Sequence, residues 1–164
     1  MQIYKFLCKF APYINQLMNT MKFIGIIPAR YASTRFPAKP LAILGGKPVI
    51  QRVYEQVAGV LDDAYVATDD ERIESVVKSF GGKVVMTSVH HKSGTDRCYE
   101  AYQKVGEGYD VIVNIQGDEP FIQRSQLEAI KSCFEDETTQ IATLVKPFTV
   151  EDGFDALENV NSPK

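Results

Sequence analysis

The sequence predicts an α/β domain whose mainly parallel sheet carries helices on both faces. Short apolar runs of strand length alternate along the chain with segments in which apolar residues recur at helical spacing. This alternation is typical of strand–helix–strand units, which build parallel sheets covered by helices. The 164 residues, 45% of them hydrophobic, are enough to form such a core.

Each expected strand is a short apolar run of the kind that is buried on both faces of a sheet. The five runs cover residues 23–27, 64–67, 84–86, 111–115 and 141–145. Between the first two runs, Pro48 suits the first turn of a helix. The apolar face of that helix is expected to consist of Ile50, Val53, Tyr54 and Val57.

Three further helices are expected. The first begins with a capping box made by Thr68 and Glu71 and stops at Gly81-Gly82. A second box, made by Ser125 and Glu128, opens another helix. A weaker helix is predicted over residues 96–105.

Both ends of the chain are expected to lie outside this pattern. Residues 1–21 form a predicted extension that is not part of the fold, and residues 22–164 form the domain portion, within which no linker interrupts residues 22–150 and one folding unit is expected. Met21 stands directly before the first strand, so we expect translation to start there. Lys5, Lys9 and Pro12 interrupt any signal-peptide core. At the other end, the chain stops without a helix cap or a terminal strand, so we expect it to be incomplete.

Composition excludes several classes of function. A net charge of −3 and a pI near 5.4 disfavour general nucleic-acid binding, which needs a basic surface. No apolar run reaches membrane-spanning length. The cysteines, which are Cys8, Cys98 and Cys133, are odd in number and form no CxxC pair, so neither a disulfide framework nor a zinc site is expected. A reducing cytoplasm fits this pattern best.

The loop after the first strand carries a cluster of cations. In PARYASTRFPAKP, the residues Arg30, Arg35 and Lys39 lie within ten positions, in a segment stiffened by prolines. Guanidinium and ammonium groups in a stiff loop can neutralise a polyphosphate together. A solvated basic surface loop explains the same residues, and spacing alone favours neither reading. The loop has neither a Walker GxxxxGK[ST] nor a GxGxxG pattern, which removes the usual support for a kinase or a dehydrogenase.

Two further loops carry polar groups. Gln116, Gly117 and Asp118 follow the fourth run, at the edge of the sheet where ligands of parallel sheets bind. Asp118 is a candidate Mg²⁺ ligand, although a simple turn before a proline is the reading that local pattern favours. The segment HKSGTDR contains Ser93 and Gly94 in a turn whose backbone could contact a base edge. Local pattern favours an ordinary helix cap by Thr95 or Asp96 there.

Taken together, four segments resemble the 3-deoxy-manno-octulosonate (Kdo) cytidylyltransferases, which join CTP to the sugar acid Kdo and release pyrophosphate. The segments are IPARYASTRFPAKPLAILGGKPVIQRV, ATDDERI, HKSGTDR and VNIQGDEP, in the family's order and at similar spacing. The resemblance covers roughly residues 22–164. It implies a fold like that of nucleotide-diphospho-sugar transferases, with the C-terminal part absent.

The resemblance also assigns roles. The catalytic group that it implies consists of Arg30, Lys39 and Asp118, with Asp118 holding Mg²⁺. The substrate-binding group that it implies consists of Ala29, Arg35, Ser93, Gly94 and Gln116. The Kdo hydroxyl would attack the α-phosphorus of CTP in line, with no covalent enzyme intermediate. The product, CMP-Kdo, would serve lipopolysaccharide biosynthesis, and a homodimer is expected for the full-length family.

Three alternatives are weighed against this assignment. A sialic acid cytidylyltransferase has the same fold and also uses CTP, but HKSGTDR and QGDEP favour Kdo. A non-catalytic nucleotide-binding remnant would retain the pocket and lack the chemistry, and the sequence leaves this alternative open. A glycosyltransferase would be expected to carry a DxD pair on the strand-end loop, and none is found there.

Overall fold

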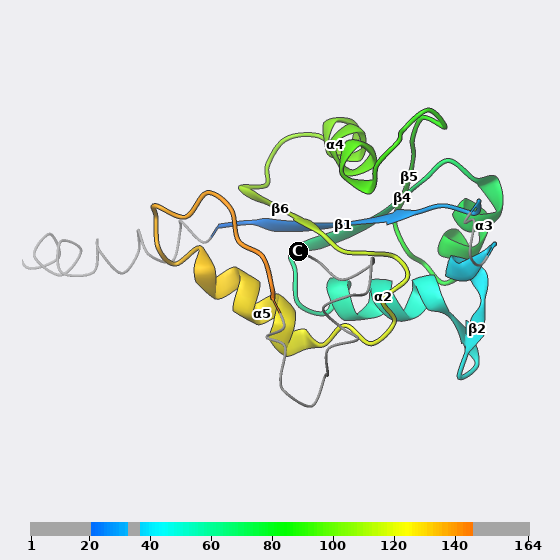
Figure 1. Cartoon of the computed structure of the whole chain (residues 1–164), viewed down its shortest axis with the longest axis horizontal. Coiled ribbons are helices and arrows are strands. Elements are labelled where there is room, and N and C mark those ends of the chain that lie inside the picture. Colours follow the sequence, from blue (N-terminus) through cyan, green and yellow to red (C-terminus); the bar gives the residue numbers. More distant parts are fainter. Residues whose placement is uncertain (1–20, 33–36, 146–164) are drawn as a thin grey trace, which may run out of the picture. The chain divides into compact units, whose positions relative to one another are not determined.

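The computed structural model describes residues 21–32 and 37–145 (Figure 1). The chain divides into two compact units, Met1–Glu128 and Ala129–Lys164. The sheet and all the described residues of the candidate site belong to the first unit. The packing predicted for residues 1–20 falls outside the described residues, so the boundary of the extension stays a prediction. No described helix is both long and apolar enough to cross a membrane.

Four of the five predicted strands form one parallel sheet in the order β5-β4-β1-β6. Their bounds are Phe23–Ala29 for β1, Asp63–Thr68 for β4, Val84–Met86 for β5 and Val111–Asn114 for β6. The predicted fold class is confirmed. Strand β1 lies in the middle, and its residues are almost completely buried because it is paired on both edges and covered on both faces.

Helices α2 (Val49–Ala58) and α4 (Gly94–Val105) cover opposite faces of this sheet (Figure 1). Successive side chains of β1 point to opposite faces. Ile24 and Ile26 pack in one cluster with Cys98 and Ala101 of α4. Gly25, between them, faces α2 so closely that a Cβ there would overlap the side chain of Val57. This alternation places a core on each side of β1.

Short elements join β1 to α2 at the edge of the sheet. The 3-10 helix η1 (Lys39–Leu41) is followed by an antiparallel pair of two-residue strands, β2 (Ile43–Leu44) and β3 (Lys47–Pro48). Helix α2 begins directly after Pro48, which is its N-cap and lies just before the first turn where the proline was expected.

Helix α3 (Glu71–Ser79) begins at a different cap from the predicted one. Thr68 is still the last residue of β4, and Asp70 caps the helix by accepting from the Arg72 N–H at 3.0 Å. The predicted capping box of Thr68 and Glu71 is therefore wrong, because the strand extends to the position where the box would begin. The helix ends before Gly81, whose φ of +79° suits glycine, as predicted.

The other helix starts also move by a few residues. Helix α4 begins at Gly94 rather than at residue 96, because Ser93 provides its cap. Helix α5 (Arg124–Cys133) begins before the predicted Ser125. The side chain of Gln126 accepts from the Gln123 N–H at 2.8 Å, which satisfies a donor just before the helix.

The fifth predicted strand is absent. Residues 141–145 have no regular secondary structure, and Ile141 and Val145 are 89% and 83% exposed. A β-strand needs a neighbour to pair with its N–H and C=O groups, and none of the described residues offers one to this run. Apolar composition alone was therefore an insufficient signal.

Candidate functional site

The candidate site lies where the order of the strands reverses. The chain runs from β1 to β4 and β5 on one side of the sheet, and then returns to place β6 on the other side of β1. In open parallel sheets, ligands bind at the carboxyl ends of the strands beside such a reversal. The Ile115 N–H donates to the Ile26 carbonyl at 3.0 Å, so the ends of the two predicted runs, residues 27 and 115, lie side by side, although β1 continues to Ala29 and β6 stops at Asn114.

A cavity of about 440 Å³ lies at this edge. It is lined by Pro28, Ala29, Arg30, Ala32, Lys39, Pro40, Lys92, Gly94, Gln116, Gly117 and Asp118. The structure therefore brings Arg30, Lys39 and Asp118 around one cleft, as predicted, together with Ala29, Gly94 and Gln116. Ser93 adjoins the lining residues, and Arg35 lies outside the described residues.

Lys39 and Asp118 both line this cavity and form an ion pair. Their Nζ and Oδ2 atoms are 2.8 Å apart, and the two side chains are 40% and 51% exposed. Ion pairs this exposed contribute little to stability, since water solvates both charges well when they separate. The ion pair can therefore open with little loss of free energy, and each side chain can then contact a substrate group instead.

Arg30 ties the end of β1 to the loop that precedes α4. Its Nη2 donates to the carbonyl of His91 and, at 3.4 Å, to that of Ser93. The loop on the far side of the cavity is thereby held by the guanidinium. Tyr31, the next residue, lies against the Arg72 guanidinium, whose Cζ is 3.2 Å from the ring centroid.

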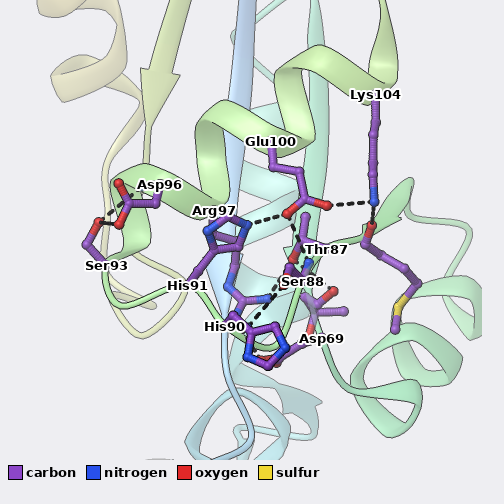
Figure 2. Close-up of polar contacts among 12 residues, drawn as sticks. Asp69, Thr87, Ser88, His90, His91, Ser93, Asp96, Arg97, Glu100 and Lys104 are labelled. Carbon is purple, nitrogen blue, oxygen red and sulfur yellow. Dashed lines mark hydrogen bonds and ion pairs between the residues drawn. The ribbon is translucent and has the colours of Figure 1, made fainter.

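Helix α4 holds the same loop from its other side (Figure 2). Glu100 accepts from the Lys104 ammonium at 2.7 Å, from the Ser88 N–H at 2.9 Å and contacts the His91 ring. These contacts, that of Lys104 foremost, lower the pKa of Glu100 to about 2. The carboxylate stays charged under all ordinary conditions and anchors both ends of the segment from Ser88 to His91.

The first turn of α4 is closed by Ser93. Its hydroxyl accepts from the Asp96 N–H at 3.1 Å and donates to the Asp96 carboxylate at 2.7 Å (Figure 2). This hydroxyl contact is the main reason why the pKa of Asp96 is lowered. The cap is made by Ser93 and not by Thr95 or Asp96, so the residue predicted to approach a base also shapes the helix start.

Arg97 lies beneath the loop and is completely buried. Its guanidinium donates to the Thr87 hydroxyl at 2.6 Å and to the Asp69 carboxylate at 2.7 Å (Figure 2). The neighbouring Cys98 is also buried, and burial raises the pKa of its thiol to about 12. A thiol that is both buried and hard to ionise is a poor nucleophile, so Cys98 is assigned to the core.

Gly117 sets the path of the loop that carries Gln116 and Asp118. A Cβ at this position would come within 2.8 Å of the Pro28 carbonyl oxygen, closer than a side chain can approach a backbone atom. Only glycine lets the loop cross the end of β1 at this distance. The crossing places Asp118 beside Lys39.

Lys92 is the pocket residue that the sequence reasoning missed. It lines the cavity from the loop between β5 and α4. A signal was present, because this loop follows the carboxyl end of a parallel strand and so reaches the same edge of the sheet as the other two. A lysine directly before the Ser93-Gly94 turn was therefore a candidate.

Asp118 is the lining residue suited to a divalent cation. Among the described residues, no group of three or more His, Cys, Asp or Glu side chains converges on one point. Mg²⁺ is commonly held by one or two carboxylates together with substrate phosphates. An exposed aspartate beside a cluster of cations fits such a shared site in its donor chemistry.

Comparison with known proteins agrees with this geometry. The chain is 87% identical to the 3-deoxy-manno-octulosonate cytidylyltransferase of Phocaeicola vulgatus over 144 residues, which cover 88% of this chain and 57% of that protein. It is 55% identical to the enzyme of the same name from Porphyromonas gingivalis over 147 residues, covering 90% and 58%. The chain thus spans a little over half the length of these curated relatives.

Solved structures give the same result. The structure of CMP:2-keto-3-deoxy-manno-octonic acid synthetase complexed with CTP aligns with a TM-score of 0.67 and 44% identity, covering 71% of this chain and 49% of that one. A cytidylyltransferase from Leptospira borgpetersenii aligns with a TM-score of 0.63 and 25% identity, covering 73% and 51%. The sequence profile described as cytidylyltransferase matches residues 24–161. With its pocket at the strand reversal and this match over most of its length, the chain belongs to the cytidylyltransferase family.

Proposed function

We propose that this chain is the nucleotide-binding part of a 3-deoxy-manno-octulosonate cytidylyltransferase, which transfers CMP from CTP to Kdo and releases pyrophosphate. The observation that carries the proposal is the cavity at the strand reversal, which is lined by three cations and a carboxylate in a chain 87% identical to an enzyme of that name. The names of the relatives favour Kdo over sialic acid as the acceptor. A structure of the related synthetase was solved with CTP, which supports CTP as the donor.

The proposed reaction exchanges one P–O bond for another. The anomeric hydroxyl of Kdo attacks the α-phosphorus of CTP and gives its proton to solvent, a new P–O bond forms, and pyrophosphate leaves with the electrons of the old P–O bond. Negative charge moves onto the departing oxygens during this step. Groups that are already oriented toward such charge lower the barrier most effectively.

The positively charged residues of the predicted site would contact the phosphates, and the uncharged ones would contact the nucleoside or the sugar acid. Arg30 and Lys39 would donate to the phosphates, and Arg35 is assigned the same role by resemblance. Lys39 would leave the Asp118 carboxylate and contact a phosphate oxygen instead. The free energy lost in this change is small because the pair is highly exposed. Ala29, Ser93 and Gly94 would border the nucleoside, and Gln116 would approach the ribose or the sugar acid.

Asp118 would hold Mg²⁺ together with the substrate phosphates. The ion, when bound, would neutralise phosphate charge during the transfer. In a chain of full family length, Asp118→Asn should raise the Mg²⁺ concentration needed for half-maximal activity, because an amide oxygen carries no formal charge. Glu119→Gln is the matched control, since Glu119 is the adjacent carboxylate and does not line the cavity. An unchanged Mg²⁺ requirement in folded Asp118→Asn protein would reduce Asp118 to a turn residue.

The acceptor can be tested directly. A chain of full family length, supplied with CTP and Mg²⁺, should release pyrophosphate with Kdo and not with N-acetylneuraminic acid. Preference for N-acetylneuraminic acid would establish the sialic acid alternative. Binding of CTP without pyrophosphate release on either acceptor would support a non-catalytic remnant.

The cellular setting belongs to the same proposal. By resemblance, the whole enzyme would act as a homodimer in the cytoplasm and supply CMP-Kdo for lipopolysaccharide biosynthesis, with CTP and Kdo as its partners and no nucleic acid or membrane. Size-exclusion chromatography with light scattering would test the dimer on protein of full family length. A monomer at micromolar concentration would contradict that part of the proposal.

A further inference from the structure

The cations that line the cavity differ in what they already bind. Lys39 is paired with Asp118, and Arg30 donates to two backbone carbonyls. Lys92, the third cation of the lining, is exposed and forms no hydrogen bond or ion pair with any other residue that the structure describes. Its ammonium is therefore the positive group of the cavity that a ligand can engage without displacing a protein acceptor.

The backbone that carries Lys92 is held on both sides. The carbonyls of His91 and Ser93 both accept from Arg30. The His91 ring contacts Glu100, and the Ser93 hydroxyl caps α4 (Figure 2). A side chain projecting from a fixed loop loses less freedom on binding than one from a mobile loop, so the contact it makes is stronger.

The charge of the lining favours an anion. Among the residues that the structure describes, the ionisable side chains that line the cavity are three cations and the carboxylate of Asp118. The Lys39–Asp118 pair is electrically neutral as a unit, so a positive excess remains around Arg30 and Lys92. A nucleoside triphosphate carries several negative charges and a sugar acid carries one, so the triphosphate is attracted more strongly.

We propose that Lys92 is a further substrate-binding residue, whose ammonium contacts a phosphate of the bound nucleotide. The inference rests on the proposed function, because it takes the nucleotide as the ligand of this cavity. A lysine acts on phosphate as a point charge and needs no fixed orientation, which suits an exposed side chain at the rim.

Calorimetric titration of CTP and of cytidine into the protein tests the assignment. Lys92→Gln keeps the length of the side chain and removes its charge, and it should weaken CTP binding about 5- to 20-fold, as for one charged hydrogen bond at an exposed site. Lys92→Arg restores the charge and should stay within about 2-fold of the wild type. Cytidine, which lacks phosphate, should bind equally to all the variants.

Lys22→Gln is the matched control. Lys22 is also exposed, but it precedes β1 and so lies at the opposite edge of the sheet from the cavity. Lys22→Gln removes the same charge from the protein as Lys92→Gln does, and CTP binding should not change. Equal weakening by Lys92→Gln and Lys22→Gln would show an effect of net charge alone and overturn the proposal.

The remaining outcomes separate the two levels of inference. If the wild-type protein does not bind CTP, the proposed function fails. If it binds CTP and Lys92→Gln binds it equally well, the assignment of Lys92 fails while the proposed function stands. Weakened binding of cytidine, or a raised KM for the sugar acid with unchanged CTP affinity, would place Lys92 at the nucleoside or at the acceptor carboxylate and overturn the phosphate contact.

Discussion

Two ion pairs of nearly equal length occupy opposite environments in this molecule. Arg97 and Asp69 are 2.7 Å apart beneath α4, with their side chains 0% and 19% exposed. Lys39 and Asp118 are 2.8 Å apart in the cavity, with their side chains 40% and 51% exposed. Distance does not distinguish them, so burial must decide what each pair does.

Burial makes the first pair structural and leaves the second free for substrate. A buried charge that loses its partner cannot be solvated, so the Arg97–Asp69 pair cannot separate at low cost. It joins the loop after β4 to α4 and accounts for one of the two guanidinium contacts, the other being the hydrogen bond to the Thr87 hydroxyl. The exposed pair loses little when it opens, which is what a site that must accept phosphate requires.

The largest expected effect comes from breaking the buried pair. Asp69→Ala should lower the free energy of unfolding by about 3 to 5 kcal/mol, because it leaves the Arg97 guanidinium buried and uncompensated. Urea denaturation followed by circular dichroism measures this loss. Asp118→Ala is the same substitution in the exposed pair and should cost less than about 1 kcal/mol. Equal losses at the two aspartates would show that burial does not separate the pairs.

The second prediction concerns turnover, which should depend on the cations of the cavity and so on the exposed pair. In a chain of full family length, Arg30→Ala or Lys39→Ala should lower turnover about 100- to 1000-fold with the fold intact, the usual range for a group aimed at developing charge. The matched control is Lys47→Ala, because Lys47 pairs with Glu55 at 2.7 Å with both side chains 45% exposed, yet lies outside the cavity. Comparable losses for Lys39→Ala and Lys47→Ala would remove the catalytic assignment.

The two pairs also differ in how far the sequence predicts them. Arg30, Lys39 and Asp118 could be placed together in advance, because apolar runs identified two strands and parallel strands end at one edge of a sheet. Arg97 belongs to the segment HKSGTDR, whose local pattern predicts a loop and a helix start. Its complete burial depends on how α4 packs on the sheet, which local pattern does not contain.

Helix starts and the fifth strand show the same limit. The run from Thr68 to Glu71 offers several oxygen-bearing side chains, and only the length of β4 decides that Asp70 is the cap. Residues 141–145 have the composition of a strand and no partner among the described residues. Whether a segment finds a partner is a property of the whole fold, so composition could not decide it. Lys92 was not predicted, although its loop follows the carboxyl end of a parallel strand and so reaches the edge of the sheet where the cavity lies.

Glu100 provides an intermediate case, since its side chain is 22% exposed. It forms an i,i+4 pair with Lys104, as Glu74 does with Lys78, both at 2.7 Å and with similar exposure. Glu100 additionally accepts from the Ser88 N–H and contacts His91. Glu100→Gln should therefore cost about 1 to 2 kcal/mol, while Glu74→Gln should cost about 0.3 to 0.5 kcal/mol.

The dependence on pH checks the cause of this difference. The pKa of Glu100 is lowered from 4.5 to about 2, so its stabilisation is present above about 4.5 and is lost as the pH falls toward 2. The gap in melting temperature between wild type and Glu100→Gln should close over that window. A gap that stays constant through the window would mean that shape, and not charge, holds the loop.

The smallest effect is expected for the stability of the exposed pair itself. A double-mutant cycle with Lys39→Ala, Asp118→Ala and the double variant should give a coupling free energy of about 0.2 to 1 kcal/mol, because both charges are well solvated when apart. The coupling should shrink further in about 1 M salt, where charges are screened beyond roughly 3 Å. The Lys47–Glu55 pair, with matched exposure, should give the same small value by the same cycle. A coupling above about 2 kcal/mol at Lys39 and Asp118 alone would mean that the pair resists opening. That coupling free energy would then oppose the contact of Lys39 with a phosphate, and the contrast with the buried pair would disappear.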